Sequence, residues 1–423
     1  MHLWVFSLLE VNLGAIPLPK VTVILTSYNH AKYLRDSIES VLAQTYAEFD
    51  LIIWDDGSTD ESWQIITSYS DPRIQAFRNE TLAHGTPINN ALSAAETGEY
   101  IAIHHSDDLW EPEKLEKQVS FLERNPQVGA VFTDVTVIDE SNQPLKDNSH
   151  VYQTVFTQPN RSRHEWLNYF FYKGNALCHP TILIRKECYI NCGLYRYGLA
   201  QLADFDMWIR LCLKYDIHIL PDKLVRLRVR SSELNSSGNR PEVRIRGQFE
   251  YFEILKNYKE LTNPNELIKV FPSAEKYMTS DGFILEFALG MAALEPESYN
   301  LTKLFGLQNL FEVINDPVKA EKVNHLYGFS NIDFMALTAQ HDVFSLEKIA
   351  SLKNQLGKLE MQLSTLETQL GTLETQLLQK NYQLHVLSQE ITDIKNSRAW
   401  KLIMNYRKFR ARFFHANQPH KTT

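Results

Sequence analysis

Apolar runs long enough for buried strands recur through the first third of the chain, with amphipathic segments between them. After the first run, Leu34, Ile38 and Val41 are spaced as on one face of a helix. After the second run, Trp63 and Ile66 have the same helical spacing. The five predicted strands are residues 21–26, 49–54, 73–79, 99–105 and 128–135. Because strands that alternate with helices are typical of βαβ units, the pattern predicts an α/β fold with a mainly parallel sheet covered on both faces.

Polar and acidic residues gather where three of these strands end. Ligands of open α/β sheets bind outside the carboxyl ends of the strands, so residues at those ends are candidates for one site. They are Thr26, Tyr28 and Asn29 after the first strand, Asp55 and Asp56 after the second, and Asp107 and Asp108 after the fourth. The sequence therefore predicts a row of acids along one edge of the sheet.

The two acidic pairs suit a nucleotide diphosphate. A divalent cation with oxygen ligands uses one or two carboxylates together with phosphate oxygens, and an acid on another strand could accept hydrogen bonds from a ribose or a base. Capping of turns by aspartate is the alternative for either pair taken alone. Neither G-x-G-x-x-G nor G-x-x-x-x-G-K-[ST] occurs, which argues against a dinucleotide dehydrogenase and a P-loop nucleotidase.

Four segments together resemble the inverting glycosyltransferases of family 2, which have the GT-A fold. They are VTVILTSYNHAKYLRDSIESVLAQTY, LIIWDDGSTDES, GEYIAIHHSDDLWEPEKLEKQV and LADFDMWIRL, and the resemblance covers roughly residues 20–235. It implies a nucleotide-sugar donor, a divalent cation (Mn²⁺ or Mg²⁺) and a hydroxyl acceptor. The chain lacks the Q-x-x-R-W motif of processive polysaccharide synthases, which favours a non-processive enzyme.

The resemblance also assigns roles to individual residues. Thr26, Tyr28 and Asp56 match nucleoside-binding positions, with Asn29 and Asp55 beside them. Ser106, Asp107 and Asp108 stand where the family has its metal-binding D-x-D element, with Asp108 as the expected cation ligand and Asp107 as the expected sugar or ribose contact.

Asp204 falls where the family keeps the acid that acts as base, although Ala203 replaces the glutamate that often precedes it. An acceptor hydroxyl must lose its proton to attack an anomeric carbon, and a nearby carboxylate is a suitable general base. Asp206 is the rival carboxylate, and a helix N-cap is the structural alternative for Asp204. If a helix begins here, Asp204 and Trp208 share one face and Asp206 points elsewhere.

Basic and imidazole side chains surround the acids in sequence. We expect residues 226–238 to form a basic loop, in which Arg228 or Arg230 could meet the diphosphate. His104 and His105 precede the second acidic pair; packing within the strand is expected, and one of them could line the sugar pocket. His179 matches the segment beneath the family's acceptor site, and a satisfied loop histidine is the alternative.

A heptad pattern begins at Ile349. Its a positions are Ile349, Leu356, Leu363, Leu370, Leu377, Leu384 and Ile391, and its d positions are Leu352, Leu359, Leu366, Leu373, Lys380, Leu387 and Ile394. Thirteen of these fourteen positions are apolar, which predicts a coiled coil and a homo-oligomer. A single helix packed on the catalytic domain is the alternative.

The C-terminal tail is basic and amphipathic. Eight Lys or Arg lie between Lys395 and Lys421 with no acid among them, and aromatic and aliphatic residues interleave with the charges. A weaker resemblance links it to the S-x-x-W-(K/R)-L tails that follow coiled coils in bacterial glycosyltransferases. Such a segment could lie on an anionic bilayer, so peripheral membrane contact is expected.

Composition narrows the setting. A net charge of −8 argues against a general nucleic-acid binder. Four cysteines in a chain of this length predict reduced thiols and a cytoplasmic protein; a metal cluster of Cys178, His179, Cys188 and Cys192 matches no zinc spacing. Residues 1–20 are apolar without a basic start and predict a packed or loosely ordered extension, and no apolar run is long enough for a transmembrane helix.

Together these features predict five regions: an extension (1–20), a catalytic domain (21–238), a helical accessory region (239–344), a coiled coil (345–396) and a basic tail (397–423). The predicted function is metal-dependent, inverting transfer of a hexosyl or N-acetylhexosaminyl group from a nucleotide sugar to a saccharide or lipid-linked acceptor. We expect the donor to be a UDP sugar. The alternatives are a degenerate transferase domain that serves as a coiled-coil scaffold and a sugar-nucleotide pyrophosphorylase.

Overall fold

The computed structural model describes residues 20–83, 86–146, 150–230 and 238–415. Nearly all of the predicted extension and much of the predicted basic loop therefore lie outside the described residues. The chain divides into two compact units, Met1–Val343 and Phe344–Thr423. The division falls between Val343 and Phe344, next to the predicted boundary between the accessory region (239–344) and the coiled coil (345–396), and none falls at residue 238.

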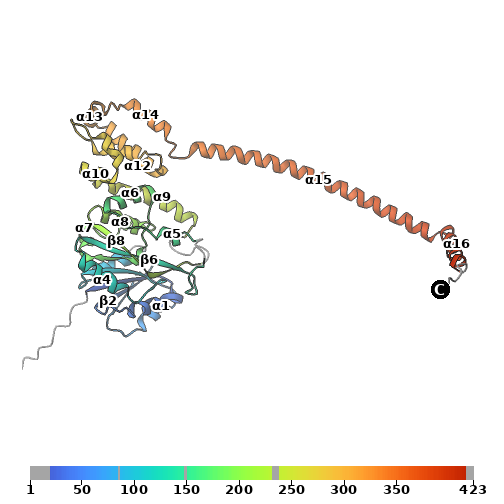
Figure 1. The fold of residues 1–423 in the computed structure, drawn as a ribbon, viewed down its shortest axis with the longest axis horizontal. Helices are drawn as coiled ribbons and strands as arrows, with labels where there is room; N and C mark the ends of the chain where they lie inside the picture. Colours follow the sequence, from blue (N-terminus) through green and yellow to red (C-terminus); the bar gives the residue numbers. More distant parts are fainter. Residues whose placement is uncertain (1–19, 84–85, 147–149, 231–237, 416–423) are drawn as a thin grey trace, which may run out of the picture. The chain divides into compact units, whose positions relative to one another are not determined.

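The first unit is built on one eight-stranded sheet of order β3-β2-β1-β4-β7-β6-β8-β5 (Figure 1). The strands are β1 (Val21–Ser27), β2 (Phe49–Asp55), β3 (Ile74–Arg78), β4 (Tyr100–His105), β5 (Leu109–Trp110), β6 (Val128–Ile138), β7 (Leu183–Arg185) and β8 (Asp216–Arg228). Pairs β1–β2, β2–β3, β1–β4 and β6–β8 are parallel, whereas β7 and β5 pair antiparallel with their neighbours. The five predicted strands and the mainly parallel sheet are confirmed.

The sequence pattern did not predict three of the strands, β5, β7 and β8. β5 and β7 are only two and three residues long, too short to show a period. β8 is long, but Pro221 and Asp222 interrupt its apolar alternation, and its end occupies residues that were predicted as loop. The prediction of a loop from residue 226 is therefore wrong for Arg226 to Arg228, which pair with β6 as strand residues.

Helices cover both faces of the sheet because alternate strand residues point to opposite sides. Val23 and Leu25 of β1 face one apolar cluster, which α1 (Ala31–Leu42), α2 (Ser62–Thr67) and α4 (Lys114–Arg124) complete. Ile24 faces a second cluster, to which α3 (Thr86–Ala94), α6 (Arg163–Lys173) and α8 (Ala203–Cys212) contribute. The sheet is thus the middle of three layers.

The second cluster continues into the region after residue 238. Ile254, Tyr258, Phe271 and Phe305 belong to the same core as Ile24 of β1. Ile254 lies in α9 (Pro241–Leu255), Phe305 in α12 (Asn300–Ile314) and Tyr258 in the 3₁₀ segment η3 (Lys256–Glu260), and Phe271 directly precedes the 3₁₀ segment η4 (Pro272–Tyr277). The first part of the predicted accessory region is therefore packed onto the catalytic layers as one body.

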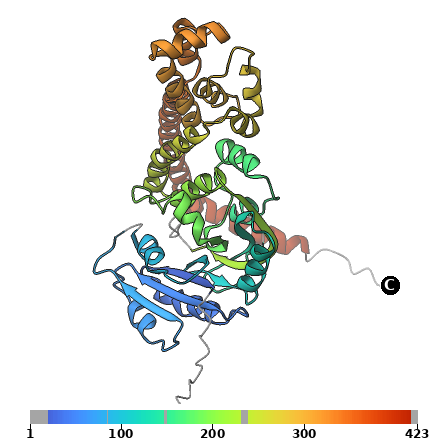
Figure 2. The same cartoon turned by 90° about the vertical axis from the view of Figure 1, so that its left-hand side faces the viewer.

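The remaining helices of this unit are short and gather in two places. The segment between β6 and α8 contains α5 (Tyr152–Val155), η1 (His179–Thr181) and α7 (Lys186–Cys192). Helices α10 (Pro264–Val270), α11 (Leu285–Ala292), α13 (Pro317–Tyr327) and α14 (Asn331–Gln340) lie at the end of the unit away from α1 and β2 (Figure 2). A separate small core around Phe287, Leu310 and Val323 joins α11, α12 and α13.

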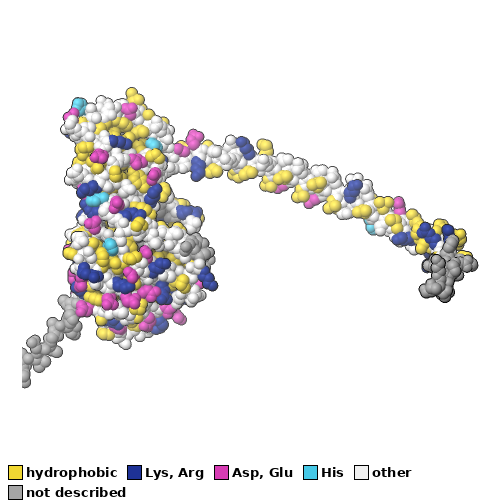
Figure 3. Space-filling view, viewed as in Figure 1, with side chains coloured by type: hydrophobic (Ala, Val, Ile, Leu, Met, Phe, Trp, Pro, Cys, Tyr) yellow, Lys and Arg dark blue, Asp and Glu magenta, His cyan; other side chains and the backbone are white. Residues whose placement is uncertain are grey.

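The second unit consists of α15 (Leu346–Asn396), a single helix of 51 residues, and α16 (Arg398–His415). No residue of α15 is buried. The thirteen apolar a and d residues all lie exposed along it, and Figure 3 shows hydrophobic side chains recurring along the helix. The heptad stripe thus has no cover within this unit.

A buried ion pair anchors α8 to the elements around it. Asp206 is fully buried, and its carboxylate accepts hydrogen bonds from Arg210 Nε at 2.8 Å and from Asn257 Nδ2 at 2.8 Å. Arg196 Nη1 lies 3.1 Å away. Arg210 in turn donates to the carbonyls of Cys192, Gly193 and Leu194. These contacts join α8 to the end of α7 and to η3.

We predict that Asp206→Asn costs about 3–5 kcal/mol of unfolding free energy, since it leaves the buried Arg210 charge without its partner. Asp222→Asn is the matched control, because Asp222 pairs with Lys117 at the surface, where side chains are 41% and 43% exposed. That change should cost less than about 1 kcal/mol. Urea unfolding of the three proteins measures the difference; equal costs for the two variants would contradict the assigned role of Asp206.

Helices α11 and α12 approach closely at two glycines. A Cβ on Gly306 would lie 2.7 Å from the carbonyl oxygen of Gly290, which no side chain can tolerate without movement of the backbone. We predict that Gly306→Ala destabilises the fold by about 1–3 kcal/mol through overpacking. Gly247→Ala in α9 is the control, since no atom lies within 4 Å of its Cβ position. It should be neutral or stabilising by up to about 1 kcal/mol in thermal unfolding.

Candidate active site

The parallel register brings the ends of three strands to one edge. Ser27 of β1 pairs with Asp55 of β2, and Thr26 pairs with His105 of β4. The polar residues that follow each strand therefore leave the sheet at the same level. Tyr28 is 38% exposed directly after β1, and Thr26 is partly exposed, so both offer accessible surface at this edge.

The two acids after β2 have different surroundings. Asp55 is fully buried; its Oδ2 accepts a hydrogen bond from the Ser58 amide at 2.9 Å and lies 3.3 Å from Arg78 Nε. Asp56 Oδ1 accepts hydrogen bonds from Asn79 Nδ2 at 2.7 Å and from the Ala83 amide at 3.0 Å. Asp55 thus shapes the turn from within, and Asp56 joins β2 to the segment after β3.

Asn29 holds two loops together. Its backbone adopts the left-handed conformation, with φ of 51°, which asparagine tolerates better than most residues. Its Oδ1 accepts a hydrogen bond from the Thr59 amide at 2.8 Å, and its own amide donates to Ser58 Oγ at 2.9 Å. The structure therefore places Asn29 between the loops after β1 and β2, with its side-chain oxygen engaged.

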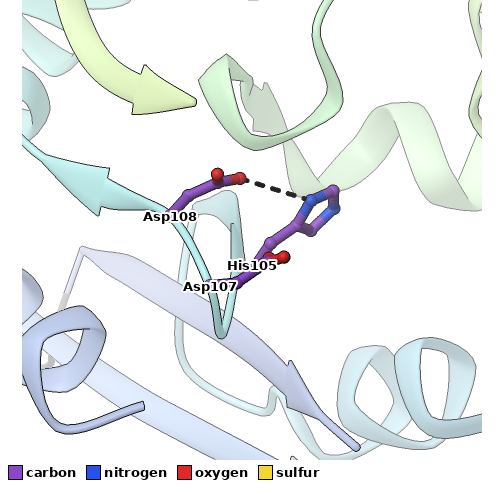
Figure 4. Close-up of side chains that lie close together, drawn as sticks. All are labelled: His105, Asp107 and Asp108. Atoms are coloured by element: carbon purple, nitrogen blue, oxygen red, sulfur yellow. Dashed lines mark ion pairs between the residues drawn. The ribbon is translucent and has the colours of Figure 1, made fainter. Parts of the chain in front are cut away.

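The segment after β4 brings three possible metal ligands together. His105, Asp107 and Asp108 each offer a ligand atom, and these atoms lie within 4.8 Å of one another (Figure 4). Asp108 is 1% exposed; its Oδ1 accepts a hydrogen bond from the Arg228 amide at 2.8 Å. Its Oδ2 forms an ion pair with His105 Nδ1 at 3.5 Å, and this interaction lowers the pKa of Asp108 against the effect of burial.

These residues fit a divalent cation. A buried carboxylate oxygen is costly unless donors or a positive charge meet it, and Asp108 Oδ2 has the His105 ring beside it at 3.5 Å, with no closer donor in the described residues. Burial raises the pKa of Asp108, with Asp107 adding to the effect. Two carboxylates and an imidazole are also a donor set that first-row divalent cations accept. The sequence predicted Asp108 as a cation ligand but did not predict that His105 could be one. The only sign of this in the sequence is that His105 stands three residues before Asp108.

The two predicted phosphate-binding arginines differ in position. Arg228 ends β8 and is 1% exposed; its guanidinium donates to the carbonyls of Asp107 at 2.6 Å and Asp139 at 2.8 Å, and lies over the Tyr33 ring. It supports the acidic segment from inside the sheet edge. Arg230 Nε lies 3.4 Å from Asp107 Oδ2, and its Nη1 lies 2.9 Å from His30 Nε2. Of the two, Arg230 is the one whose guanidinium group lies beside the carboxylate of a candidate metal ligand, Asp107.

Asp204 lies in the first turn of α8. Its Oδ2 accepts a hydrogen bond from Asn175 Nδ2 at 3.2 Å, and its Oδ1 accepts one from the Phe205 amide at 2.7 Å. Burial raises the pKa of Asp204 to about 6. The N-cap of α8 is Leu202, so Asp204 is not a helix cap. Asp206 is held in its ion pair with Arg210, so Asp204 is the carboxylate of this turn that is available to an acceptor.

Two further predictions concern metals and membranes. Among the described residues, His105, Asp107 and Asp108 form the one histidine, cysteine and acid group with spacing suited to a metal, so the alternative cluster of Cys178, His179, Cys188 and Cys192 does not form. Burial raises the pKa of all four cysteine thiols. In the described part of the chain, no helix combines the length and the hydropathy needed to cross a bilayer.

Known proteins resemble this chain over the region that holds these residues. The model of "Glycosyl transferase family 2" matches residues 22–191. An uncharacterized glycosyltransferase of Methanocaldococcus jannaschii is 31% identical over 222 residues, which cover 51% of this chain and 73% of that protein. Putative glycosyltransferase EpsE of Bacillus subtilis is 35% identical over 198 residues, or 45% of this chain and 66% of EpsE.

A solved structure is also similar. Residues 1–349 of S. aureus TarS, crystallised with UDP-GlcNAc, align with 73% of this chain and 91% of that one, at 19% identity and a TM-score of 0.49.

The family match begins in β1 and includes both acidic segments at the sheet edge. The relative from M. jannaschii extends the likeness to about half of the chain. The resemblance and the GT-A type fold expected from the sequence are thereby confirmed: the chain belongs to glycosyl transferase family 2.

Proposed function

We propose that this glycosyltransferase moves a hexosyl or N-acetylhexosaminyl group from a UDP sugar to a hydroxyl of a saccharide or lipid-linked acceptor, with inversion and without processive extension. The observation that supports this most directly is Asp204, an acid with a pKa of about 6 in the same site as the His105, Asp107 and Asp108 group. Electrostatic interaction between Asp204 and His105 links the two parts of this site.

On the donor side, Thr26, Tyr28 and Asp56 would hold the nucleoside at the ends of β1 and β2. Tyr28 offers an exposed ring for stacking, and Asp56 is fixed by Asn79 and the Ala83 amide. Asn29 and Asp55 would act indirectly by shaping the two loops. Arg230, beside Asp107, would meet the diphosphate, because a guanidinium group matches phosphate oxygens.

Asp108 would hold a divalent cation, Mn²⁺ or Mg²⁺, with Asp107 nearby for the sugar or the ribose. When bound, the cation would neutralise charge that develops on the leaving diphosphate. Arg228 keeps the acidic segment in place by donating to Asp108 Oδ1 and to the Asp107 carbonyl. Asp108 Oδ2, which is buried and lies 3.5 Å from His105 Nδ1, is the atom of this segment that a cation would meet.

On the acceptor side, Asp204 would remove the proton of the attacking hydroxyl. A general base works best when its pKa lies near the working pH, and burial brings Asp204 toward that range. Its negative charge would also favour an oxocarbenium-like transition state. Asn175, which donates to Asp204 Oδ2, orients the carboxylate.

The two alternative functions, a sugar-nucleotide pyrophosphorylase and an inactive coiled-coil scaffold, are less well supported. A pyrophosphorylase would want a glycine-rich phosphate loop after β1, and the segment LTSYNHAKYL has none. A scaffold without activity would need neither Asp56, Asp107 and Asp108 at one sheet edge nor Asp204 near them in α8.

We expect Asp204→Asn to abolish sugar transfer while UDP still binds, since the residue serves the acceptor. In the unchanged protein, kcat/KM should fall as pH drops through about 6, because the raised pKa leaves Asp204 protonated below that value and a protonated acid cannot accept a proton. The assay is release of UDP from a panel of UDP sugars with and without Mn²⁺, alongside isothermal titration with UDP. An active Asp204→Asn variant would refute its role as base.

The second unit supports a further part of the proposal, self-association through α15 in the cytoplasm. Thirteen exposed apolar side chains at a and d positions would remain in water on an isolated helix, which favours pairing. Glu360, Glu367 and Glu374 occupy e positions, and Gln362, Gln369 and Gln376 occupy g positions. Parallel helices place glutamate opposite glutamine, whereas antiparallel ones bring rows of glutamate together, so a parallel coiled coil is favoured.

Parallel pairing would also gather the basic tails at one end. Each Lys or Arg near an anionic surface contributes on the order of 1 kcal/mol, and joined tails bind more tightly than separate ones. In α16, Leu402, Ile403 and Phe409 are exposed among basic residues, a composition suited to the surface of a membrane. We therefore propose peripheral contact with an anionic bilayer.

Leu366→Asp with Leu370→Asp should convert the oligomer to a monomer and weaken binding to anionic vesicles, because both residues lie in the seam. Ser364→Asp with Thr368→Asp is the matched control, with equal charge on the outer face of the same turns. Light scattering after size-exclusion chromatography and vesicle sedimentation give the readouts. A chain ending at Phe344 should be monomeric and active, since the first unit is compact to Val343. Unchanged mass in the seam variant would contradict the coiled coil.

A further inference from the structure

A line of hydrogen-bonding side chains leads away from the candidate metal ligands. His105 Nε2 lies 3.2 Å from His179 Nδ1, and His179 Nε2 lies 2.8 Å from Tyr195 Oη. Tyr195 Oη is 3.1 Å from Tyr189 Oη. The four side chains come from β4, η1, the segment after α7, and α7 itself. None of them was assigned a role with the cation by the sequence.

The direction of these bonds matters for His105. Its Nδ1 is the ring nitrogen near Asp108 Oδ2, so Nδ1 is the atom able to reach a cation held by that carboxylate (Figure 4). When one imidazole nitrogen binds a metal, the other must carry the proton and needs an acceptor. His179 Nδ1 is that acceptor. Its own Nε2 then donates to Tyr195, whose hydroxyl can donate onward to Tyr189.

The surroundings hold His179 in place. Its ring makes edge contacts with Trp208 at 5.7 Å and lies 5.5 Å from the Tyr195 ring. Tyr195 and Tyr189 are both buried, with 4% exposure each. His179 also begins the short η1 helix, where Pro180 follows it and restricts the backbone. A rigid second layer of this kind fixes the orientation of the ligand it contacts.

We propose that His105 supplies a nitrogen ligand, through Nδ1, to the divalent cation beside Asp108, and that His179 and Tyr195 are positioning residues for it. This rests on the proposed function, in which a cation binds with the nucleotide sugar. An imidazole ligand suits first-row transition cations better than Mg²⁺, which prefers oxygen ligands in an octahedral arrangement. The site therefore selects Mn²⁺ or Co²⁺ over Mg²⁺, which an all-oxygen site would not do to the same degree.

The test uses the full chain with UDP as the nucleotide probe. Electron paramagnetic resonance measures free Mn²⁺ during titration, competition with Mg²⁺ gives the ratio of the two affinities, and electron spin echo modulation reports a ¹⁴N nucleus bonded to Mn²⁺. The unchanged protein should show ¹⁴N modulation. His105→Asp makes the ligand set all oxygen. This variant should lose the ¹⁴N modulation, and its ratio of Mn²⁺ affinity to Mg²⁺ affinity should fall by about tenfold or more.

Variants at His179 test whether this residue orients His105 or only fills space in the core. His179→Leu should weaken Mn²⁺ binding by about 10–100-fold, and His179→Gln should recover much of the loss, since its amide can accept from His105 and donate to Tyr195. His218→Gln is the control, because His218 stacks on Phe121 and takes no part in this line of bonds. Melting temperatures identify any variant that fails to fold, and His179→Gln then remains as the informative one.

The outcomes distinguish this inference from the function beneath it. If UDP binds equally well without any cation, the metal dependence in the proposed function fails, and the inference falls with it. If UDP binding needs a cation while ¹⁴N modulation is absent, or while the affinity ratio is the same in His105→Asp, the inference alone is overturned.

Discussion

The parallel pairing of β1 with β2 and β4 is the constraint on which the site depends. Its register sets Ser27 beside Asp55 and Thr26 beside His105, so three polar segments leave the sheet at one level. This arrangement is held by strands that are buried on both faces between two apolar clusters. A slip of one residue would turn the alternate apolar side chains to the wrong layer, so burial of the core fixes the geometry of the edge.

Charge compensation then gives the acids at this edge and in α8 different roles. Asp55 lies beside Arg78, Asp107 beside Arg230, and Asp206 between Arg210 and Arg196. Asp204 has only amide donors among the described contacts, from Asn175 and Phe205. Burial raises its pKa to about 6, because the carboxylate loses hydration and its hydrogen bonds and the charge of His105 offset that loss only in part. The same turn of α8 thus holds one acid that stabilises the fold and one that is free to react with protons.

The helices after residue 238 also help to hold the acids of α8 in place. Tyr258 and Phe271 pack in the same core as the sheet, and Asn257 donates to Asp206. The anchoring of α8, and with it the position of Asp204, therefore depends on residues from the predicted accessory region, outside the segments that carry the family resemblance. By contrast, α15 shares no core with any described element of its own unit, which is consistent with a partner supplied by another copy of the chain.

Some of this could be predicted from the sequence, because it depends on local period and local chemistry. Five apolar runs predicted five strands, adjacent acids marked the edge, and a seven-residue repeat predicted the long helix, since each signal lies within a few residues of its own position. The tertiary structure decided what depends on distant contacts: the inward position of Arg228, 120 residues from Asp108; the contact of His105 with His179, 74 residues apart; and the burial of Asp206 against Asn257. A side chain's role follows from what packs against it, and in a folded chain those partners come from segments whose proximity no local pattern records.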